Sequence, residues 1–364
     1  MAEQRLYPLL FEPNMHKVVW GGKRLLPWKG IGTSDDGAPV GESWEVSAVE
    51  SSPSVVSNGP AAGKLLTEVV AENPIGILGK SVAERYGNRL PLLVKFIDTE
   101  KDLSIQVHPN DEMAQREHGK FGKTEMWYII DAKPGAYLYA GFNKHLTPEE
   151  YKRKVADGTI TEVLARHEVH KGDVFFLPAG RIHAICGGIL LAEVQQSSDV
   201  TYRIYDYNRP GIDGKPRELH TELAARALDF SVQDEYRTIY ESPEAQASHC
   251  IDSPYFSVRV VDIDRPFHRN LIKYDSFVIT MCINGDCLLR IRETGEETLL
   301  REGWSCLIPA DIADYDVIPV AESRENTAQA IHSTSHVRLL DAYIDNKDRS
   351  LMKMAARFLH ITRK

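Results

Sequence analysis

Two stretches of the sequence share one pattern, and together they constrain the fold. Residues 172–183 read GDVFFLPAGRIH and residues 303–314 read GWSCLIPADIAD. In each stretch a glycine is followed by a largely apolar run and then by Pro-Ala, and a polar residue ends the stretch. A glycine turn, a buried strand and a bend limited by proline, used twice, predict two related β-modules. The second copy has Asp314 where the first has His183, so any chemistry that needs this histidine is confined to the first module.

The remaining sequence is typical of a β-rich protein with many tight turns. Gly and Pro occur 25 and 19 times and separate short runs rich in Val, Ile, Leu, Phe and Tyr. Such runs, bounded by turn residues, predict strands. Asn284-Gly285 lies between two of the runs and predicts a hairpin turn. The clearest predicted strands are 90–97, 103–107, 126–130, 136–139, 174–177, 188–194, 257–261, 277–283, 287–292 and 305–308.

Helices are predicted at few positions. Thr147 followed by Pro-Glu-Glu is a strong helix start, because Thr can cap the first turn, Pro fits it and Glu follows three residues after the cap. It opens the segment 151–167, which is interrupted near Gly158, and we expect a small helical insert at about 145–168. The other predicted helices are 64–72 and 81–86, which flank a break at Pro74 and Gly76, and an amphipathic helix at 350–359.

The length of 364 residues indicates one large domain or two ordinary ones. A polar stretch without clear periodicity, 233–254, is the expected boundary, so we expect an N-terminal domain at 1–235 and a C-terminal domain at 236–364. The hydrophobic fraction of 43% is sufficient for a sizeable core.

Charge and cysteine usage limit the partners and the compartment. A net charge of −9 is unfavourable for binding nucleic acid or an anionic membrane, although a few local cations could still hold a small anionic substrate. No stretch approaches the roughly 18 apolar residues of a membrane span, and no signal peptide is visible. Five cysteines without a CxxC spacing are expected to be reduced thiols of a cytoplasmic protein. Three of them, Cys282, Cys287 and Cys306, are expected to face the core.

Four side chains could together hold a metal ion. Gln106 and His108 end the alternating strand LSIQVH, and the side-chain period of two places them on one face. Glu125 precedes the apolar run MWYII, and His183 ends the first glycine–proline stretch. Each residue alone has an ordinary structural explanation. Together, two imidazoles, a carboxylate and an amide oxygen suit a borderline divalent ion; we expect zinc first, with manganese, iron or cobalt as alternatives.

Further charged residues follow the same stretch. Glu193, Asp199 and Arg203 come after the strand that begins beyond His183. The guanidinium of Arg203 offers a planar set of donors for a phosphate or a developing oxyanion, and a surface Asp–Arg pair is the ordinary alternative. Lys95 lies inside the apolar run LPLLVKFI, so it must either pair with a carboxylate or point into a polar cavity.

These motifs together resemble the type I mannose-6-phosphate isomerases (phosphomannose isomerases) of the cupin superfamily. Residues 172–183 fit the second cupin signature, G(X)5PXG(X)2H, although Gly187 stands where an Asn is expected four residues beyond the histidine. The first signature is modified, because Gln106-Val107-His108 replaces His-X-His and the glutamate is displaced to 125. The runs IQVHPND, KTEMWY, LPAGRIHA and SDVTYR carry the resemblance, and GESWEVS resembles an N-terminal strand of the family. It is strong over residues 7–210 and weak in the C-terminal third.

The resemblance implies a mainly β fold with two cupin (jelly-roll) barrels and a small helical insert, the second barrel being a degenerate copy without metal. The segment 151–167 is much shorter than the helical domain of larger members, so the chain resembles the short bacterial form. Thr124 stands where many members have Pro. The implied metal ligands are Gln106, His108, Glu125 and His183. The implied catalytic residues are Arg203, Lys123 and Asp199, with Glu193 lining the cavity.

The implied activity is a metal-dependent aldose–ketose isomerisation of mannose 6-phosphate and fructose 6-phosphate through a cis-enediol(ate). The general base stays open among Asp199, Glu193 and a metal-linked group. Two other functions are considered: a cupin dioxygenase, in which iron activates oxygen, and a non-catalytic cupin that binds sugar phosphates. We expect one Zn²⁺ per chain, a hexose 6-phosphate substrate and no nucleic-acid or membrane partner. The oligomeric state stays open between monomer and homodimer.

Overall fold

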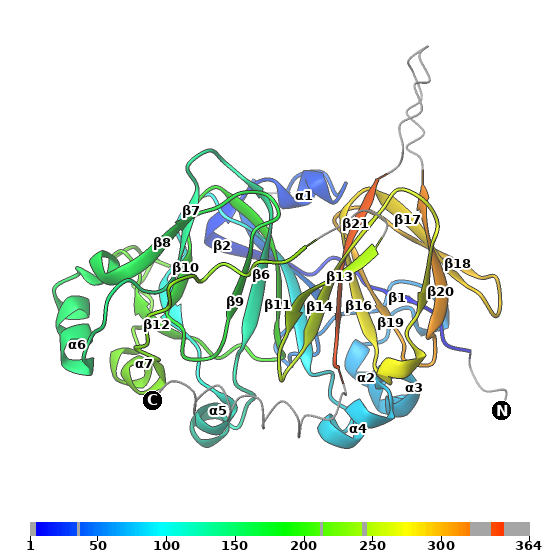
Figure 1. Cartoon of the computed structure of the whole chain (residues 1–364), viewed down its shortest axis with the longest axis horizontal. Helices are drawn as coiled ribbons and strands as arrows, with labels where there is room; N and C mark the ends of the chain where they lie inside the picture. The colour runs from blue at the N-terminus through cyan, green and yellow to red at the C-terminus, as the bar shows by residue number, and fades with distance from the viewer. Residues whose placement is uncertain (1–4, 35–36, 212–213, 242–245, 321–335, 346–364) are drawn as a thin grey trace, which may run out of the picture.

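The computed structural model describes residues 5–34, 37–211, 214–241, 246–320 and 336–345. Over these residues the fold is mainly β, and two jelly-roll barrels lie side by side (Figure 1). The first barrel is built from the N-terminal part of the chain and the second from the C-terminal part, as the colour sequence in Figure 1 shows.

Two antiparallel sheets form the first barrel. Its six-stranded sheet has the spatial order β2 (Met15–Gly22), β3 (Val40–Val46), β4 (Leu92–Asp98), β11 (Ile189–Gln196), β6 (Glu125–Ala132) and β9 (Val174–Leu177). Its five-stranded sheet has the order β12 (Tyr202–Tyr205), β5 (Ile105–Val107), β10 (His183–Ile185), β7 (Tyr137–Phe142) and β8 (Leu164–Glu168).

The second barrel is built in the same way. Its six-stranded sheet has the order β1 (Leu9–Leu10), β19 (Ser305–Ile308), β16 (Val278–Asn284), β21 (Val337–Tyr343), β14 (Ser257–Ile263) and β13 (Gln246–Asp252). Its four-stranded sheet has the order β15 (Phe267–Asn270), β20 (Asp314–Val320), β17 (Asp286–Ile291) and β18 (Glu297–Leu300). The short strand β1 comes from the N-terminus, so the beginning of the chain closes an edge of the second barrel.

The internal repeat of the sequence corresponds to a repeat of the topology. The order β4-β11-β6-β9 in one barrel matches β14-β21-β16-β19 in the other, and β5-β10-β7-β8 matches β15-β20-β17-β18. Gly172 and Gly303 have φ values of +92° and +79°, and a strand begins two residues after each. A backbone with positive φ favours glycine, because a Cβ would clash there. The two stretches are therefore the same structural unit, as the sequence predicts.

The second barrel is degenerate at the positions that matter for metal binding. His183 lies opposite Gln106 where β10 pairs with β5, and Asp314 lies opposite Asn270 where β20 pairs with β15. β9 corresponds to β19. Glu125 of β6 lies opposite Leu177 at the end of β9, and Val278 of β16 lies opposite Ile308 at the end of β19, so Val278 corresponds to Glu125. The second barrel has Asn270, Val278 and Asp314 where the first has Gln106, Glu125 and His183.

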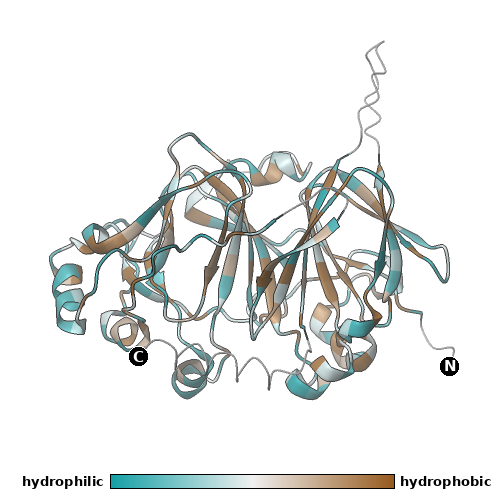
Figure 2. Cartoon of the chain, in the orientation of Figure 1, coloured by the Kyte–Doolittle hydropathy of each residue, from teal (hydrophilic) through white to brown (hydrophobic). Residues whose placement is uncertain are grey.

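The two six-stranded sheets pack against each other, and this packing fixes which side chains face the first barrel's interior. Along β4, Leu92, Val94 and Phe96 belong to the core shared with the second barrel, whereas Ile97 packs inside the first barrel. Because both faces are covered, the whole strand is buried, which explains its continuous apolar run. Lys95 alternates with these residues and so faces the interior. Figure 2 shows that the strands of both barrels carry much of the strongly hydrophobic sequence.

Helices cover the outer face of the five-stranded sheet. α6 (Pro148–Ala156) begins at a capping box in which Thr147 accepts from the N–H of Glu150, as its sequence predicts. Tyr151 of α6 and Ala224 of α7 (Thr221–Ala227) belong to the same hydrophobic cluster as Ile105 and Val107 of β5, and α7 contacts both α6 and β5. Since successive residues of a strand face opposite sides, Gln106 is left to face the barrel interior. None of the described helices is long and apolar enough to cross a membrane.

The remaining helices are short. Asp275 of the second barrel accepts hydrogen bonds from the N–H groups of Lys80 and Ser81 at 2.9 and 2.8 Å and thereby caps α4. This cap joins a helix of the N-terminal half to the second barrel. The helical elements not yet given are α1 (Leu25–Trp28), α2 (Leu66–Glu72), α3 (Pro74–Leu78), α4 (Lys80–Tyr86), α5 (Asp111–His118), η1 (Gly59–Ala61), η2 (Ile160–Val163) and η3 (Ile272–Tyr274).

Three expectations from the sequence differ from the structure. Asn284-Gly285 does not close a hairpin, because β16 and β17 pair with other strands and belong to different sheets of the second barrel. The helical segment expected at 151–167 ends early, since η2 follows α6 and residues 164–168 form β8. The expected break at Pro74 is itself the start of α3, because proline fits the first helical position. The predicted helix at 350–359 lies outside the described residues.

All five cysteines are buried free thiols. Cys282, Cys287 and Cys306 lie in the core of the second barrel, as expected from the sequence.

Candidate metal centre

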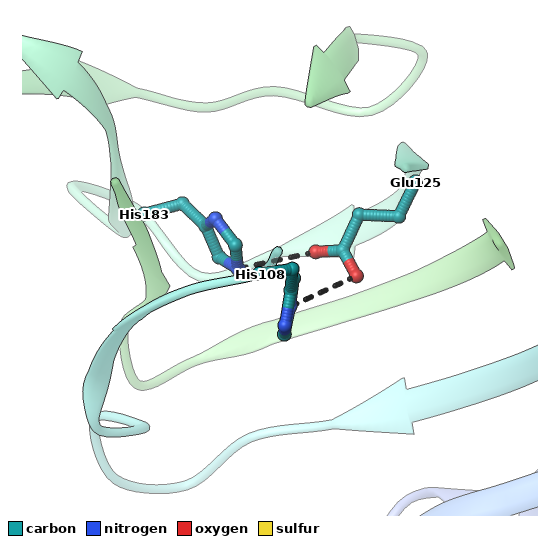
Figure 3. A group of neighbouring side chains, drawn as sticks. All are labelled: His108, Glu125 and His183. Carbon is teal, nitrogen blue, oxygen red and sulfur yellow. Dashed lines mark ion pairs between the residues drawn. The ribbon is translucent and has the colours of Figure 1, made fainter. Parts of the chain in front are cut away.

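Three side chains converge inside the first barrel from three separate positions in its sheets (Figure 3). His183 begins β10, Glu125 begins β6, and His108 directly follows β5. The Nε2 atom of His183 lies 3.2 Å from Oε1 of Glu125, and Nε2 of His108 lies 3.4 Å from Oε2. All three side chains are buried. One candidate ligand atom from each residue lies within 4.8 Å of the other two, which is close enough for a single ion to contact all three.

The backbone sets the orientation of both imidazoles. Nδ1 of His108 lies 2.9 Å from the carbonyl oxygen of Val200, and Nδ1 of His183 lies 2.8 Å from that of Arg181. A carbonyl oxygen only accepts hydrogen bonds, so each Nδ1 carries the proton. The lone pair of each Nε2 is therefore directed toward the carboxylate of Glu125, which is the arrangement that metal-ligating histidines use.

Several atoms at the centre of this cluster lack hydrogen-bond partners. They are Nε2 of His108 and both carboxylate oxygens of Glu125, and all three are buried. Lys123 forms an ion pair with Glu125 at 2.9 Å but does not complete a hydrogen bond to it. Buried polar atoms without partners are costly and uncommon. A divalent cation would supply the missing partner to every one of these atoms, so the residues fit a metal ion.

The electrostatics favour the protonation states that ligate a metal. Burial lowers the pKa of His108 to about 3, with a further contribution from the charge of Lys123. Burial also lowers the pKa of His183. For Glu125 burial opposes ionisation, but Lys123 and the two imidazoles outweigh it and hold its pKa well below the ordinary value. Neutral imidazoles and an ionised carboxylate are the forms that bind metal.

Gln106, the fourth ligand expected from the sequence, reaches the same cluster. It lies opposite His183 in the pairing of β5 with β10, and its Nε2 is 3.3 Å from Nε2 of His183. A half-turn of the terminal amide exchanges its nitrogen and oxygen and would present Oε1 to the centre.

A cleft of about 200 Å³ opens beside the cluster. It combines apolar walls, including Trp44 and Trp127, with a high density of charged groups. The residues expected from the sequence to handle the substrate, Lys123, Glu193, Asp199 and Arg203, all line it, together with Gln106. His108, Glu125 and His183 are not among its lining residues, but Lys123 and Gln106, which contact the cluster, are, so the cleft lies next to the cluster and can hold a small polar ligand.

Lys95 fulfils both alternatives that its sequence position allows. Its Nζ lies 3.2 Å from Oε1 of Glu193 and 3.6 Å from Oε2 of Glu42, and it also lines the cleft. Burial alone would lower the pKa of Lys95, but the two carboxylates raise it above the ordinary value. Glu193 accepts a further hydrogen bond from Nε1 of Trp127 at 2.9 Å, which fixes its orientation.

Arg203 and Asp199 occupy different environments. Arg203 lies opposite Gln106 in the pairing of β12 with β5, and its Nε is buried without a hydrogen-bond partner. Burial lowers its pKa, and the nearby charge of Arg217 lowers it further. Asp199 lies at the exposed rim, where Lys120 pairs with it at 2.6 Å. The surface Asp199–Arg203 pair considered from the sequence is replaced by this contact.

One charged residue of the cleft has no counterpart in the sequence analysis. Arg217 lines the cleft and holds Asp206 through two hydrogen bonds of 2.7 and 2.6 Å. It stands in a Gly- and Pro-containing loop, where no periodicity predicts the direction of a side chain. Only the return of this loop to β12 brings Arg217 to the cleft.

Comparisons with protein families agree with this geometry. A family model described as "Phosphomannose isomerase type I, catalytic domain" matches residues 9–137, and one described as "Mannose-6-phosphate isomerase, cupin domain" matches residues 246–321. The probable mannose-6-phosphate isomerase GmuF of Bacillus subtilis is 36% identical over 314 residues, which cover 85% of this chain and 96% of that protein. The mannose-6-phosphate isomerase ManA of the same organism is 39% identical over 254 residues, covering 69% and 78%.

Solved structures share the fold. A mannose 6-phosphate isomerase from Bacillus subtilis has a TM-score of 0.80 at 32% identity, and the match covers 93% of this chain and 99% of that one. A zinc-bound mannose 6-phosphate isomerase has a TM-score of 0.72 at 18% identity, covering 93% and 100%. The second likeness concerns the fold alone.

Proposed function

The chain belongs to the type I phosphomannose isomerases, and from this premise we propose that His108, Glu125 and His183 form the metal centre of its isomerase site. The reaction is the reversible conversion of the aldose mannose 6-phosphate into the ketose fructose 6-phosphate. The observation that carries the proposal is the set of buried Nε2 and carboxylate atoms that face one another without hydrogen bonds. Gln106 is the proposed fourth ligand, because its amide reaches the same point.

Zinc is the first candidate for the ion. Two imidazoles, one carboxylate and one amide oxygen suit zinc, and manganese, iron or cobalt would also accept this set. When bound, the ion supplies positive charge that stabilises oxygen atoms of the reacting sugar. The residues that would hold it are buried beside the cleft, so the chain's own residues in the cleft must orient the substrate and move the proton.

Isomerisation moves a proton between C2 and C1 through a cis-enediol(ate), and the carbonyl oxygen gains negative charge on the way. We propose that Arg203 stabilises this charge. Its guanidinium projects from the position opposite Gln106, and its buried Nε has no partner within the described chain. A fixed donor in a site with little water acts more strongly on a developing charge than it would in bulk water.

The proton-transfer groups are proposed from the remaining charged residues of the cleft. Glu193 is held by Lys95 and Trp127 and so has a fixed position. Lys123 bridges the cleft to Glu125, and its burial keeps its amine near the cluster. Asp199 stands at the rim, where it is open to solvent. All three are candidates to hold or transfer the proton, and Glu193 is the most rigidly positioned of them.

A coupled assay for fructose 6-phosphate formed from mannose 6-phosphate tests the proposal. The purified chain should lose activity after exhaustive chelation and regain it when zinc is added back, with about one ion per chain by metal analysis. Full activity in the chelated protein would end the metal hypothesis.

The same protein separates the alternative functions. Oxygen uptake by the iron(II)-loaded chain would indicate a dioxygenase. Binding of mannose 6-phosphate without turnover would indicate a binding protein. Relatives named as isomerases match this chain over most of their own length, which supports the isomerase.

Two wider features belong to the same proposal. We propose a division into an N-terminal domain at 1–235 and a C-terminal domain at 236–364, supported by the two repeated barrels. We also propose that the chain works in the cytoplasm, for which its five buried free thiols are the support.

A further inference from the structure

The chemistry of the substrate requires a second recognition point in the cleft. In a hexose 6-phosphate the reacting carbons are C1 and C2, and the phosphate ester is at the opposite end of the carbon chain. A phosphate monoester carries about −1.5 to −2 charges at neutral pH. If the metal centre and Arg203 hold the reacting end, cations elsewhere along the same cleft must hold the phosphate.

The side chains near Arg203 carry more positive than negative charge, which favours binding of a phosphate. Arg217 and Arg209 both hydrogen-bond Asp206, and Arg203 has no carboxylate partner among the described ion pairs. Three guanidiniums therefore lie near the buried carboxylate of Asp206, and even with Glu218, whose charge also acts on Arg203, the group has more positive than negative charges. The other cations of the cleft are matched, because Lys95 pairs with Glu193 and Lys123 with Glu125.

Arg217 is the member of this group that points to the cleft from a fixed position. Its Nε and Nη2 donate to the two oxygens of Asp206 at 2.7 and 2.6 Å, and it lines the cleft together with Arg203. A guanidinium clamped through two hydrogen bonds retains further N–H donors in one plane, which suits a phosphate. Arg209 also contacts Asp206, at 2.9 Å, but lines a different pocket beside Lys17 and Lys101.

The turn at 206–209, which carries Asp206 and Arg209, has a well-defined backbone conformation. Tyr207 and Asn208 have φ values of 57° and 52°, and the N–H of Arg209 donates to the carbonyl oxygen of Asp206 at 3.2 Å. A tyrosine in the left-handed region is uncommon, and such conformations persist where the surrounding structure enforces them. The turn directs Arg209 back onto Asp206, and Asp206 in turn orients Arg217.

We propose that Arg217, oriented by Asp206, binds the phosphate group of the hexose 6-phosphate and sets the preference of the cleft for phosphorylated sugars. The inference rests on the proposed isomerase function of the same cleft. It assigns Arg203 to the reacting end and Arg217 to the phosphate end. No contact between Arg217 and the metal cluster is needed for this role.

Steady-state kinetics of the zinc-loaded enzyme test the proposal with R217A, R217K and the control R290A. Loss of a charged donor pair predicts that KM for mannose 6-phosphate rises about tenfold to a hundredfold in R217A, with kcat changed less than about threefold. R217K should recover part of the loss, since it restores the charge without the planar donors. R290A should stay within about threefold of the wild type in KM, because Arg290 lies on β17 of the second barrel and pairs there with Glu297.

Inorganic phosphate provides a second readout that does not depend on turnover. Phosphate should raise the melting temperature of the wild-type and R290A proteins, and it should raise that of R217A or R217K much less. An unchanged KM and an unchanged phosphate effect in both Arg217 variants would overturn the proposal, as would an equal loss in R290A. If the wild-type protein does not isomerise mannose 6-phosphate, the proposed function fails, whereas the phosphate measurement still decides the role of Arg217.

Discussion

Replacing Lys123 by methionine tests how the negative charge of Glu125 is compensated in the buried cluster. Lys123 lies 2.9 Å from Oε2 of Glu125, and the side chains are 6% and 0% exposed. Methionine retains most of the length and apolar volume of lysine and removes the charge. In the metal-free protein the carboxylate of Glu125 then loses its ion-pair partner, while burial still favours the neutral imidazoles of His108 and His183.

The size of the effect should depend on the metal. Removing one member of a buried ion pair costs about 3–5 kcal/mol, because the other charge stays buried without compensation. For K123M we therefore expect the free energy of unfolding of the metal-free protein to fall by about 3–5 kcal/mol. With zinc bound, the ion itself compensates the carboxylate, and the loss should fall to about 1 kcal/mol.

Urea unfolding of wild type and K123M, each with excess chelator and with saturating zinc, measures both values. K120M is the matched control, because Lys120 pairs with Asp199 at 2.6 Å while 50% of its side chain is exposed. An exposed pair contributes about 0–1 kcal/mol, so K120M should show little loss with or without zinc. An equal loss for K123M in both conditions would refute the reasoning that zinc and Lys123 neutralise the same carboxylate.

Three further outcomes are expected. R203A should keep its metal content but lose about a hundredfold or more in kcat, and near-normal turnover would remove Arg203 from the mechanism. H183A should lose both bound metal, measured by atomic absorption, and activity; retention of a full metal complement would show that His183 is not a ligand. Burial opposes ionisation of Asp275, but the donors at Ser81 and Lys80 hold its pKa below the ordinary value, so its stabilising effect is present above about pH 4 and is lost as the pH falls further. D275N should therefore cost about 1 kcal/mol at neutral pH, and its melting temperature should approach that of the wild type near pH 3.

Local patterns predicted the parts of the fold that local chemistry determines. The strands at 174–177 and 305–308 have the bounds that their glycine and proline neighbours indicate. Thr147 caps a helix because the whole capping box lies within four residues. The Asn284-Gly285 turn shows the limit of this approach. Its residues indicate the turn, but the pairing partners of β16 and β17 depend on distant strands that close the barrel.

The candidate site divides in the same way. Gln106 and His108 end a recognisable alternating strand, so alternation predicts that they share a face. Glu125 and His183 joined them in the prediction through their chemistry as metal ligands and through the family resemblance. Arg217 could not be found in this way, because its position depends on a loop without regular period and on Asp206, a partner that the sequence does not mark.

Strand β1 has a consequence for how the protein is made. Leu9 and Leu10 leave the ribosome long before their partners Leu307 and Cys306, which lie much later in the chain. Until these residues pair, the outer edge of the C-terminal sheet lacks its last strand, and an open edge invites pairing with other chains. A fusion tag placed directly before residue 9 should therefore disturb the second barrel, although the tag is joined to the sequence that leads into the first.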